Sequence, residues 1–164
     1  MEPMDPVERK KISIEFFKKG YEAQMGGELN QAISLYQKSI EMFPTAEALT
    51  FLGWALSFLG RYREAIDFCK KAIEIDPNFG NPYNDIGAYC IELNELDEAI
   101  PFLEKASKAT RYETPWFPHY NLGRVWEAKG MIKKAMQGYQ RALEENPEYA
   151  LAMESLDRLK NQLN

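Results

Sequence analysis

The sequence is poor in the residues that build metal sites and nucleophilic catalytic centres. Its 164 residues include two cysteines and one histidine. These are too few for a zinc site made of cysteine and histidine ligands, and they leave little for nucleophilic catalysis. No phosphate-binding glycine loop and no nucleophile–base pair is recognisable either. We therefore expect no catalytic residues, no metal site and no cofactor.

Positive charge is also scarce. The chain has 20 Lys and Arg residues against 25 Asp and Glu residues, which gives a net charge of −5. Proteins that bind nucleic acids or anionic membrane surfaces need basic surface to displace counterions. The composition therefore argues against both kinds of partner.

Long hydrophobic runs are missing as well. The longest uncharged stretch spans residues 48–60 and is interrupted by Thr50 and Ser57, whereas a membrane-spanning helix needs about 20 apolar residues. The first eleven residues are acidic and then basic, without a signal-peptide core behind them. Cys69 and Cys90 lie in apolar helical patterns, which favours buried thiols in a reducing compartment over redox-active ones. We expect a cytoplasmic protein without membrane insertion, with removal of an N-terminal leader as the alternative.

What the sequence does contain is a repeat, carried by three tracks of small residues. The first track is Gly20, Gly53, Gly87 and Gly123, at intervals of 33, 34 and 36 residues. The second follows twelve residues later and consists of Ala32, Ala65, Ala99 and Ala135. The third, seven residues further on, is Ser39, Ala72, Ala106 and Ala142. Pro44, Pro77 and Pro147 close three of the four units. Self-similarity at this period indicates a stacked repeat architecture.

Each unit has the pattern of two helices joined by a short turn. Apolar or small residues recur at helical spacing on both sides of that turn. Because a mid-helix glycine costs about 1 kcal/mol relative to alanine, four of them in register require a packing reason. We expect the two helices of each unit to approach closely at the glycine. Large residues then fill the volume beside it, namely Tyr36, Cys69, Leu103 and Tyr139.

The periodicity predicts an all-α protein with nine helices and no strand. The expected ranges are 6–25, 29–42, 46–58, 62–75, 80–92, 96–109, 116–129, 132–145 and 148–162. Asp5-Pro6 is a start signal for the first helix, because aspartate caps helices and proline suits the first helical turn.

These residues resemble the tetratricopeptide repeat. The second unit meets the family pattern through Leu49, Leu52, Gly53, Leu56, Ala65, Cys69, Ala72 and Pro77. The third and fourth units repeat it, for example at Ile86-Gly87 and Leu122-Gly123, while the first is looser because Lys19 and Ser39 depart from it. The resemblance covers about residues 13–147 and is specific for fold, but it does not specify function.

The resemblance implies a right-handed superhelix, an α-solenoid of four helix-turn-helix repeats. The repeats span 13–45, 46–79, 80–115 and 116–147, after an N-terminal extension of the first helix at 1–12. Residues 148–164 form a capping helix, in which we expect Met153, Leu156 and Leu163 to cover the last repeat.

In such a superhelix the first helix of each repeat lines a concave groove, and residues off the packing stripe face into it. We expect Phe17, Tyr21, Trp54 and Phe58 to form an apolar patch there, since exposed aromatic patches usually mark interfaces. The full set of candidate peptide-binding residues is Phe17, Tyr21, Thr50, Trp54, Phe58, Asn81, Asn84, Tyr120, Asn121 and Arg124. The alternative is that strong curvature or residues 1–12 bury the aromatic side chains within the chain.

One subclass of the family grips the C-terminal carboxylate of heat-shock chaperones with lysine, asparagine and arginine side chains. The matching positions here are Phe17, Tyr21, Phe51, Asn81 and Asp85. The basic residues of that clamp are absent, and Asp85 would repel a carboxylate. The resemblance therefore implies an apolar or amphipathic partner segment rather than an acidic tail.

The joint between the third and fourth units is irregular. Residues 110–118 contain two prolines and three aromatic residues. The joint is either a longer turn whose Trp116 folds back onto the core or a protruding contact loop. His119 occupies a position that the family fills with a large residue, so we interpret it as packing rather than catalysis.

Three functions remain open at this point. The favoured one is a non-catalytic scaffold that binds a peptide segment of a partner protein. The second is a self-assembling, homo-oligomeric scaffold, and the least favoured is a small enzyme or ligand carrier. The sequence does not identify the partner or the pathway.

Overall fold

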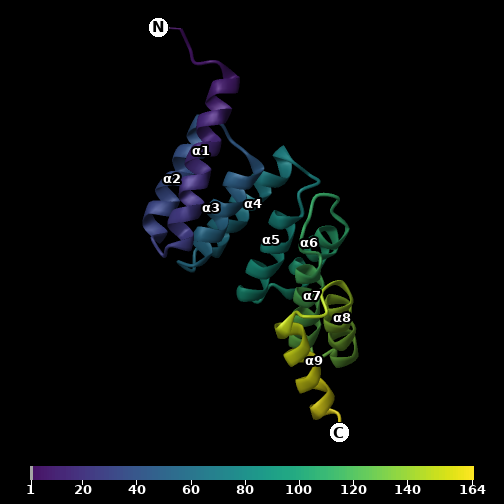
Figure 1. Cartoon of the computed structure of the whole chain (residues 1–164). Coiled ribbons are helices and arrows are strands. Elements are labelled where there is room, and N and C mark those ends of the chain that lie inside the picture. Colours follow the sequence, from purple (N-terminus) through teal and green to yellow (C-terminus); the bar gives the residue numbers. More distant parts are fainter. Residues whose placement is uncertain (1) are drawn as a thin grey trace. The chain divides into compact units, whose positions relative to one another are not determined.

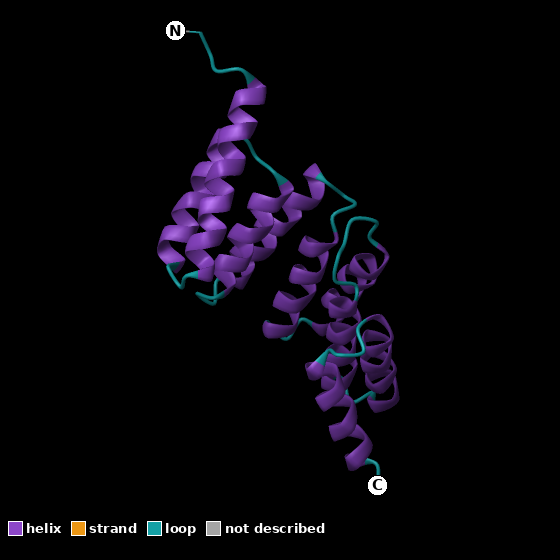
Figure 2. Cartoon of the chain, in the orientation of Figure 1, coloured by secondary structure: helices purple, strands orange, loops and turns teal. Residues whose placement is uncertain are grey.

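The structure, a computed structural model, describes residues 2–164, and in that range it contains nine helices joined by loops, with no sheet (Figures 1 and 2). The helices are α1 (Pro6–Met25), α2 (Leu29–Met42), α3 (Ala46–Ser57), α4 (Tyr62–Ile75), α5 (Gly80–Glu92), α6 (Leu96–Lys108), α7 (Trp116–Ala128), α8 (Ile132–Glu145) and α9 (Ala150–Gln162). The predicted ranges agree with these bounds to within two residues, so the predicted all-α class is confirmed.

The chain divides into two units. The first ends at Pro77 and holds α1–α4, and the second begins at Asn78 and holds α5–α9. In each unit, consecutive helices pair as hairpins: α1 packs on α2, α3 on α4, α5 on α6 and α7 on α8. The hairpins also stack on their neighbours within a unit, through α2 and α3 in the first and through α6 and α7 in the second.

The four glycines of the first small-residue track lie where two helices of a hairpin come closest. A Cβ atom added at Gly20, Gly87 or Gly123 would lie 2.7 Å from Tyr36, 2.3 Å from Leu103 or 2.6 Å from Tyr139. At Gly53 it would lie 3.0 Å from the carbonyl oxygen of Ala65 and 3.3 Å from the Sγ of Cys69. The predicted large neighbour is therefore confirmed at Gly20, Gly87 and Gly123, whereas at Gly53 the backbone of Ala65 lies nearest and Cys69 next. These close contacts explain why helix-weakening glycines stand here.

The turns inside the four hairpins use one backbone conformation. Gly27, Gly60 and Gly130 have φ angles of 83°, 73° and 76°, and Asn94 takes the equivalent place in the third hairpin with φ 57°. Glycine is free of strain in this left-handed region, and asparagine tolerates it better than most other residues.

A buried pair of serines explains why the first repeat departs from the family pattern. The hydroxyl of Ser13 lies 2.8 Å from the carbonyl oxygen of Ser39 and 2.7 Å from that of Phe43. Ser39 in turn donates to the carbonyl oxygen of Ser13 over 2.7 Å. Serine at position 39 thus joins α1 to α2 through hydrogen bonds, where alanine in the other repeats contributes packing alone.

The joint before α7 folds back onto its own unit. The ring of Tyr112 lies over Gly80, and the guanidinium carbon of Arg111 is 4.0 Å from the ring centroid of Phe79. Trp116 packs against the hydrophobic cluster of α8 and α9. Of the two alternatives for residues 110–118, the structure has the turn that packs on the core.

The ninth helix covers the last repeat with a different face from the one expected. Ala152, Leu156 and Leu159 are buried in the cluster with Tyr139, whereas Met153 and Leu163 are exposed. Leu156 was placed correctly, but the expectation for Met153 and Leu163 is wrong. Residues 152, 156 and 159 are spaced by four and three residues and so share one helix face, which excludes position 153.

Candidate functional site

The first unit presents a connected row of aromatic rings on α1, on α3 and at the C-cap of α3, which we call the N-terminal aromatic face. Its members are Phe17, Tyr21, Phe51, Trp54 and Phe58. Ring centroids lie 5.2 Å apart for Phe17 and Phe51, 5.7 Å for Tyr21 and Phe51, 5.7 Å for Phe51 and Trp54, and 5.5 Å for Trp54 and Phe58. All four contacts are edge-to-face, the arrangement that aromatic quadrupoles favour.

The outer part of this face is open to solvent. Phe58 is 63% exposed and Tyr21 is 43% exposed, while Phe17, Phe51 and Trp54 are partly buried beneath or beside them. Phe51, Trp54 and Phe58 follow one another at intervals of three and four residues, so they share one side of α3. Solvent-accessible rings in contact with one another form a surface that a partner could cover.

Tyr36 supports the face from below. It is fully buried, its ring centroid is 5.9 Å from that of Phe17 and 6.3 Å from that of Phe51, and its hydroxyl donates to Oε1 of Gln24 over 2.7 Å. Burial, and the nearby Tyr21, raise the pKa of the Tyr36 hydroxyl well above its usual range. This hydroxyl is therefore a neutral hydrogen-bond donor that holds the ring, and with it the row above, in place.

Thr50 does not belong to this surface. It is 1% exposed, and its hydroxyl donates to the carbonyl oxygen of Ala46 in the same helix over 2.7 Å. The sequence interpretation placed Thr50 in the groove, but Thr50 is buried, and it is its neighbour Phe51 that belongs to the N-terminal aromatic face. One residue corresponds to about 100° of rotation around a helix, which separates a buried position from a surface one.

In the second unit two of the three predicted asparagines, Asn84 and Asn121, are buried and bound to each other. The side-chain amide of Asn121 on α7 donates to Oδ1 of Asn84 on α5 over 3.0 Å, and the two residues are 7% and 8% exposed. Arg124 donates to Oδ1 of Asn121 over 3.1 Å and to Glu92 over 3.3 Å. These four residues form what we call the polar ladder between α5 and α7.

Asp85 continues the ladder at its other end. It is partly buried, and burial raises the pKa of its carboxyl group to about 7, against the opposing effect of a hydrogen bond from Asn84. The neighbouring Tyr112 is also perturbed, mainly by burial, which raises the pKa of its hydroxyl. Near neutral pH, Asp85 is therefore divided between its charged and neutral forms.

Tyr120 belongs to a ring cluster at the end of the second unit. Its ring centroid is 5.3 Å from that of Tyr149 and 5.5 Å from that of Tyr139, and Tyr149 also contacts Phe117. Burial, together with Tyr120, raises the pKa of the Tyr149 hydroxyl to about 12. Tyr120 is partly buried by these contacts, so it offers less surface than Tyr21 or Phe58.

The ten predicted residues thus fall into two sets, five in each unit. Tyr21, Trp54 and Phe58 keep exposed or partly exposed rings, and Asn81 and Arg124 are partly exposed. Residues that the sequence interpretation left out of the set are Phe51, Asp85 and Glu92. The spacing of Phe51 to Trp54 and Phe58 was a usable signal, whereas the pairing of Asn84 with Asn121 depends on how α5 and α7 pack.

No group of three or more His, Cys, Asp or Glu residues in the described range is arranged to hold a metal ion. Residues 2–164 also include no helix that combines the length and apolarity needed to cross a membrane. Cys69 and Cys90 are both buried, as their apolar patterns predicted.

Comparison with known proteins assigns the family. Family models described as the tetratricopeptide repeat match residues 46–79, 68–100 and 119–149. A curated relative, the BBSome complex member BBS4 of Bos taurus, is 25% identical over 141 residues, which are 85% of this chain and 27% of BBS4. The chain spans only 20% to 27% of the length of the first three curated relatives that it matches.

Solved structures share the fold. PilF of Pseudomonas aeruginosa has a TM-score of 0.88 at 21% identity, over 94% of this chain and 70% of PilF. The first TPR of Spaghetti (RPAP3), solved with the HSP90 peptide SRMEEVD, has a TM-score of 0.65 at 23% identity, over 72% of this chain and 92% of that one. The repeat spacing, the hairpins closed at glycines, the family models and the shared fold agree, and this chain belongs to the tetratricopeptide repeat family.

Proposed function

We propose that this chain is a non-catalytic protein-interaction module whose N-terminal aromatic face binds an apolar or amphipathic segment of a partner protein. The observation that carries the proposal is the exposure of Phe58 and Tyr21 at the outer edge of a connected row of rings. Burying a phenylalanine side chain contributes about 1.5–3 kcal/mol, and aromatic anchors of this kind dominate interface energies.

The surroundings of the face favour an apolar occupant. Ile14, Met25 and Leu59 are exposed large hydrophobic residues on the same two helices or just after them. The rings are held by edge-to-face contacts and by the buried Tyr36 beneath them, so a partner would meet a surface that is already ordered. An ordered surface reduces the entropy lost on binding.

An acidic tail is a poor occupant of the clamp positions. RPAP3 was solved with the peptide SRMEEVD, which carries three acidic residues. The clamp positions of this chain are Phe17, Tyr21, Phe51, Asn81 and Asp85, and none of them carries a positive charge. The proposed ligand class therefore differs from the one that RPAP3 binds.

The second unit has a smaller role in the proposal. Within this unit Asn81, Tyr120 and Arg124 keep some exposed surface, whereas Asn84 and Asn121 bind each other and are not available to a ligand. Arg124 offers a planar set of donors, but it already contacts Asn121 and Glu92.

The test is cross-linking mass spectrometry in native lysate with the full chain and two variants. Phe58→Ala removes the outer ring of the face, and Ile75→Ala, at the end of α4, removes another exposed apolar side chain of the same unit. We expect partner cross-links near Trp54 to fall more than tenfold in Phe58→Ala and to persist in Ile75→Ala. Circular dichroism melting should be nearly unchanged in both, since surface substitutions usually alter stability by less than about 0.5 kcal/mol.

Unchanged cross-links in Phe58→Ala would show that the face is not the binding surface. Light scattering tests the second candidate, a self-assembling scaffold. A mass well above 19.0 kDa that returns to the monomer value in Phe58→Ala would mean that a second copy covers the face.

A further inference from the structure

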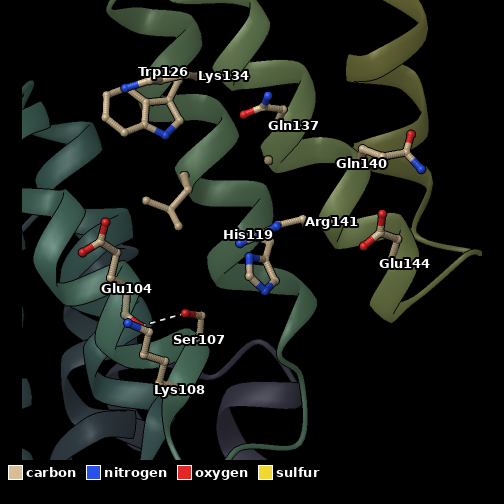
Figure 3. A pocket seen from close by; sticks show the side chains of 12 residues that line it. Glu104, Ser107, Lys108, His119, Trp126, Lys134, Gln137, Gln140, Arg141 and Glu144 are labelled. Atoms are coloured by element: carbon tan, nitrogen blue, oxygen red, sulfur yellow. Dashed lines mark hydrogen bonds between the residues drawn. The ribbon is translucent and has the colours of Figure 1, made fainter.

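The second unit contains a cleft that is separate from the N-terminal aromatic face. Its volume is about 740 Å³, and it lies between α6 and α8 with α7 as its floor (Figure 3). The lining residues on α7 are His119, Leu122 and Trp126. They lie on a different side of α7 from Tyr120 and Arg124, because a helix turns about 100° per residue.

The floor of the cleft combines apolar and polar surface. Leu122, Trp126 and His119 are all partly buried. The ammonium group of Lys134 lies 4.4 Å from the ring centroid of Trp126, so this lysine is occupied by a cation–π contact. Gln137 and Gln140 on α8 add amide groups to the wall.

The walls of the cleft carry a net charge of opposite sign to that of the whole chain. Basic side chains are contributed by Lys108 on α6 and by Lys134 and Arg141 on α8, and acidic ones by Glu104 and Glu144. The cleft therefore carries a net positive charge of one in a chain of net charge −5. Within the described part of the chain, neither Lys108 nor Arg141 forms an ion pair or a side-chain hydrogen bond.

The pKa of His119 responds to these surrounding charges. Burial lowers the pKa of its imidazole, and the positive charge of Arg141 lowers it further, while Glu145 and Glu144 act in the opposite direction. The imidazole is therefore neutral at pH 7, with one donor and one acceptor nitrogen. Figure 3 places it beside the Arg141 side chain inside the cleft.

We propose that this cleft is a second peptide-binding site, which takes a segment of a partner protein carrying one acidic side chain next to an apolar one. The carboxylate would lie between Arg141 and Lys108, the two cations of the cleft that have no partner. The apolar side chain would cover Leu122, and Gln137 and Gln140 would bind the peptide backbone.

A single carboxylate fits the cleft better than a phosphate group. A phosphate carries up to two charges at neutral pH, and Glu104 and Glu144 in the walls would repel it. Arginine binds a carboxylate through two parallel hydrogen bonds, and charge-assisted bonds of this type are about twice as strong as neutral ones. The amide side chains and the apolar floor extend beyond what a small carboxylate could use, which favours a peptide.

The proposal does not depend on the aromatic face, because no residue is shared between the two surfaces. The first test is an array of octapeptide mixtures. In each mixture one amino acid is fixed at one position and the other positions are random, and the purified chain is then bound to the array. We expect glutamate or aspartate to be selected over glutamine at least fivefold, with an apolar residue within two positions. Phe58→Ala should leave this selection unchanged.

Three variants test the residues. Arg141→Gln should lower affinity for a selected acidic peptide about tenfold, and Lys108→Gln about threefold. Lys133→Gln, an exposed lysine next to the cleft on α8 that does not line it, should have no effect. A melting curve recorded for each variant shows whether it folds.

His119 locates the bound peptide, because it is the single histidine of the chain and its imidazole resonances need no assignment. The charged groups around it are Glu104 and Lys108 on α6, and Lys134, Arg141, Glu144 and Glu145 on α8. A carboxylate bound beside Arg141 should raise the pKa of His119 by about half a unit or more. The matched glutamine peptide should not raise it.

Several outcomes would overturn the proposal. It fails if the array selects no acidic residue, if Arg141→Gln keeps the selection, or if the acidic peptide leaves the His119 titration unchanged. It also fails if acetate or succinate shifts His119 as strongly as the peptide at the same concentration, because the site would then bind free carboxylates. A His119 shift that grows with protein concentration alone would identify a second copy of the chain as the occupant.

Discussion

The first helices of the second and third repeats pack in their hairpins in the same way, but their outward side chains differ: aromatic in the second repeat and mainly acidic in the third. On α3 and at the residue that follows it, the outward side chains are Phe51, Trp54 and Phe58; 34 residues later the corresponding residues are Asp85, Ala88 and Glu92. The glycine between them is the same, at 53 and 87, and it packs against the second helix of its hairpin in both cases. The small-residue tracks therefore keep the hairpin the same, while the side chains at the outward positions differ and make different contacts in each unit: Phe51 with other rings, and Glu92 with Arg124.

The buried neighbours of these positions differ in a second way. Thr50 and Asn84 are also 34 residues apart, and both are buried polar residues. Thr50 satisfies its hydroxyl on its own helix, whereas Asn84 depends on Asn121 of α7. The hydroxyl of Thr50 is therefore satisfied within one helix, whereas the hydrogen bond of Asn84 joins the third and fourth repeats.

The largest effect is expected where the shared scaffold is broken. Gly87→Ala would place a Cβ atom 2.3 Å from Leu103, and Gly53→Ala would place one 3.0 Å from the Ala65 carbonyl oxygen. Overpacking typically costs about 1–3 kcal/mol, and the helix preference of alanine offsets about 1 kcal/mol of that. We expect Gly87→Ala to lower the free energy of unfolding in urea by about 2 kcal/mol and Gly53→Ala by less than about 1 kcal/mol.

The double variant Gly87→Ala/Leu103→Ala is the control for this prediction. Its loss of unfolding free energy should be smaller than the sum of the losses in the two single variants, because the smaller side chain at position 103 makes room for the new methyl group. Additive losses would show that the clash is not the cause.

The next effect is a pH dependence of stability that is expected at Asp85 of the second unit and not at the equivalent position of the first. Asp85 has a pKa of about 7 in the folded chain, above the ordinary value near 4, so the folded state retains a proton that the unfolded state releases. Its contribution is fully present below pH 4 and is lost as the pH rises through about 7. We expect Asp85→Asn to raise the free energy of unfolding at pH 8 by about 1–2 kcal/mol and to change it little at pH 4.

Urea unfolding at both pH values measures this difference. Phe51, which occupies the equivalent position of the previous repeat, does not titrate, so Phe51→Leu should shift stability equally at pH 4 and pH 8. An equal shift for Asp85→Asn at both values would contradict the raised pKa.

A smaller effect tests the coupling of repeats in the second unit. Asn121→Ala leaves the buried oxygen of Asn84 without its donor and removes an acceptor from Arg124. Leaving a buried polar group unsatisfied costs about 1–3 kcal/mol, so we expect a loss of about 1–2 kcal/mol in urea unfolding. Asn81→Ala, at a partly exposed asparagine of α5, should cost less than about 0.5 kcal/mol. Equal losses would argue against the polar ladder.

The smallest effect concerns the turn in which the repeats differ. Asn94 has φ 57°, where the other three hairpins have glycine. Asn94→Gly should raise the free energy of unfolding by about 0.5 kcal/mol, because it removes the strain of a left-handed residue. The reverse change, Gly60→Asn, should lower it by a similar amount, and differential scanning calorimetry of both variants checks the sign.

The repeat architecture could be predicted because its signals are short-range. Gly20, Gly53, Gly87 and Gly123 recur at a visible interval, and the helices between them begin and end within two residues of the predicted bounds. The partners of these glycines also followed from the spacing, since each lies a fixed number of residues further along the chain.

The candidate surface was predicted less completely because it depends on the rotation of each helix and on the helices packed against it. Trp54 and Phe58 were placed on the correct side of α3, but Thr50 was exchanged with Phe51. Asn84 and Asn121 were expected to face a ligand and instead face each other. The cleft beside His119 is lined by residues of three helices, and no local sequence pattern predicts it.

The amino-acid order alone determined that this chain forms helical hairpins and where each one bends, because small side chains and turn residues act on their immediate neighbours. Only the packed molecule decided which polar groups are consumed internally and which rings stay accessible. That choice depends on a rotation of about 100° between adjacent residues and on the helix that happens to lie opposite.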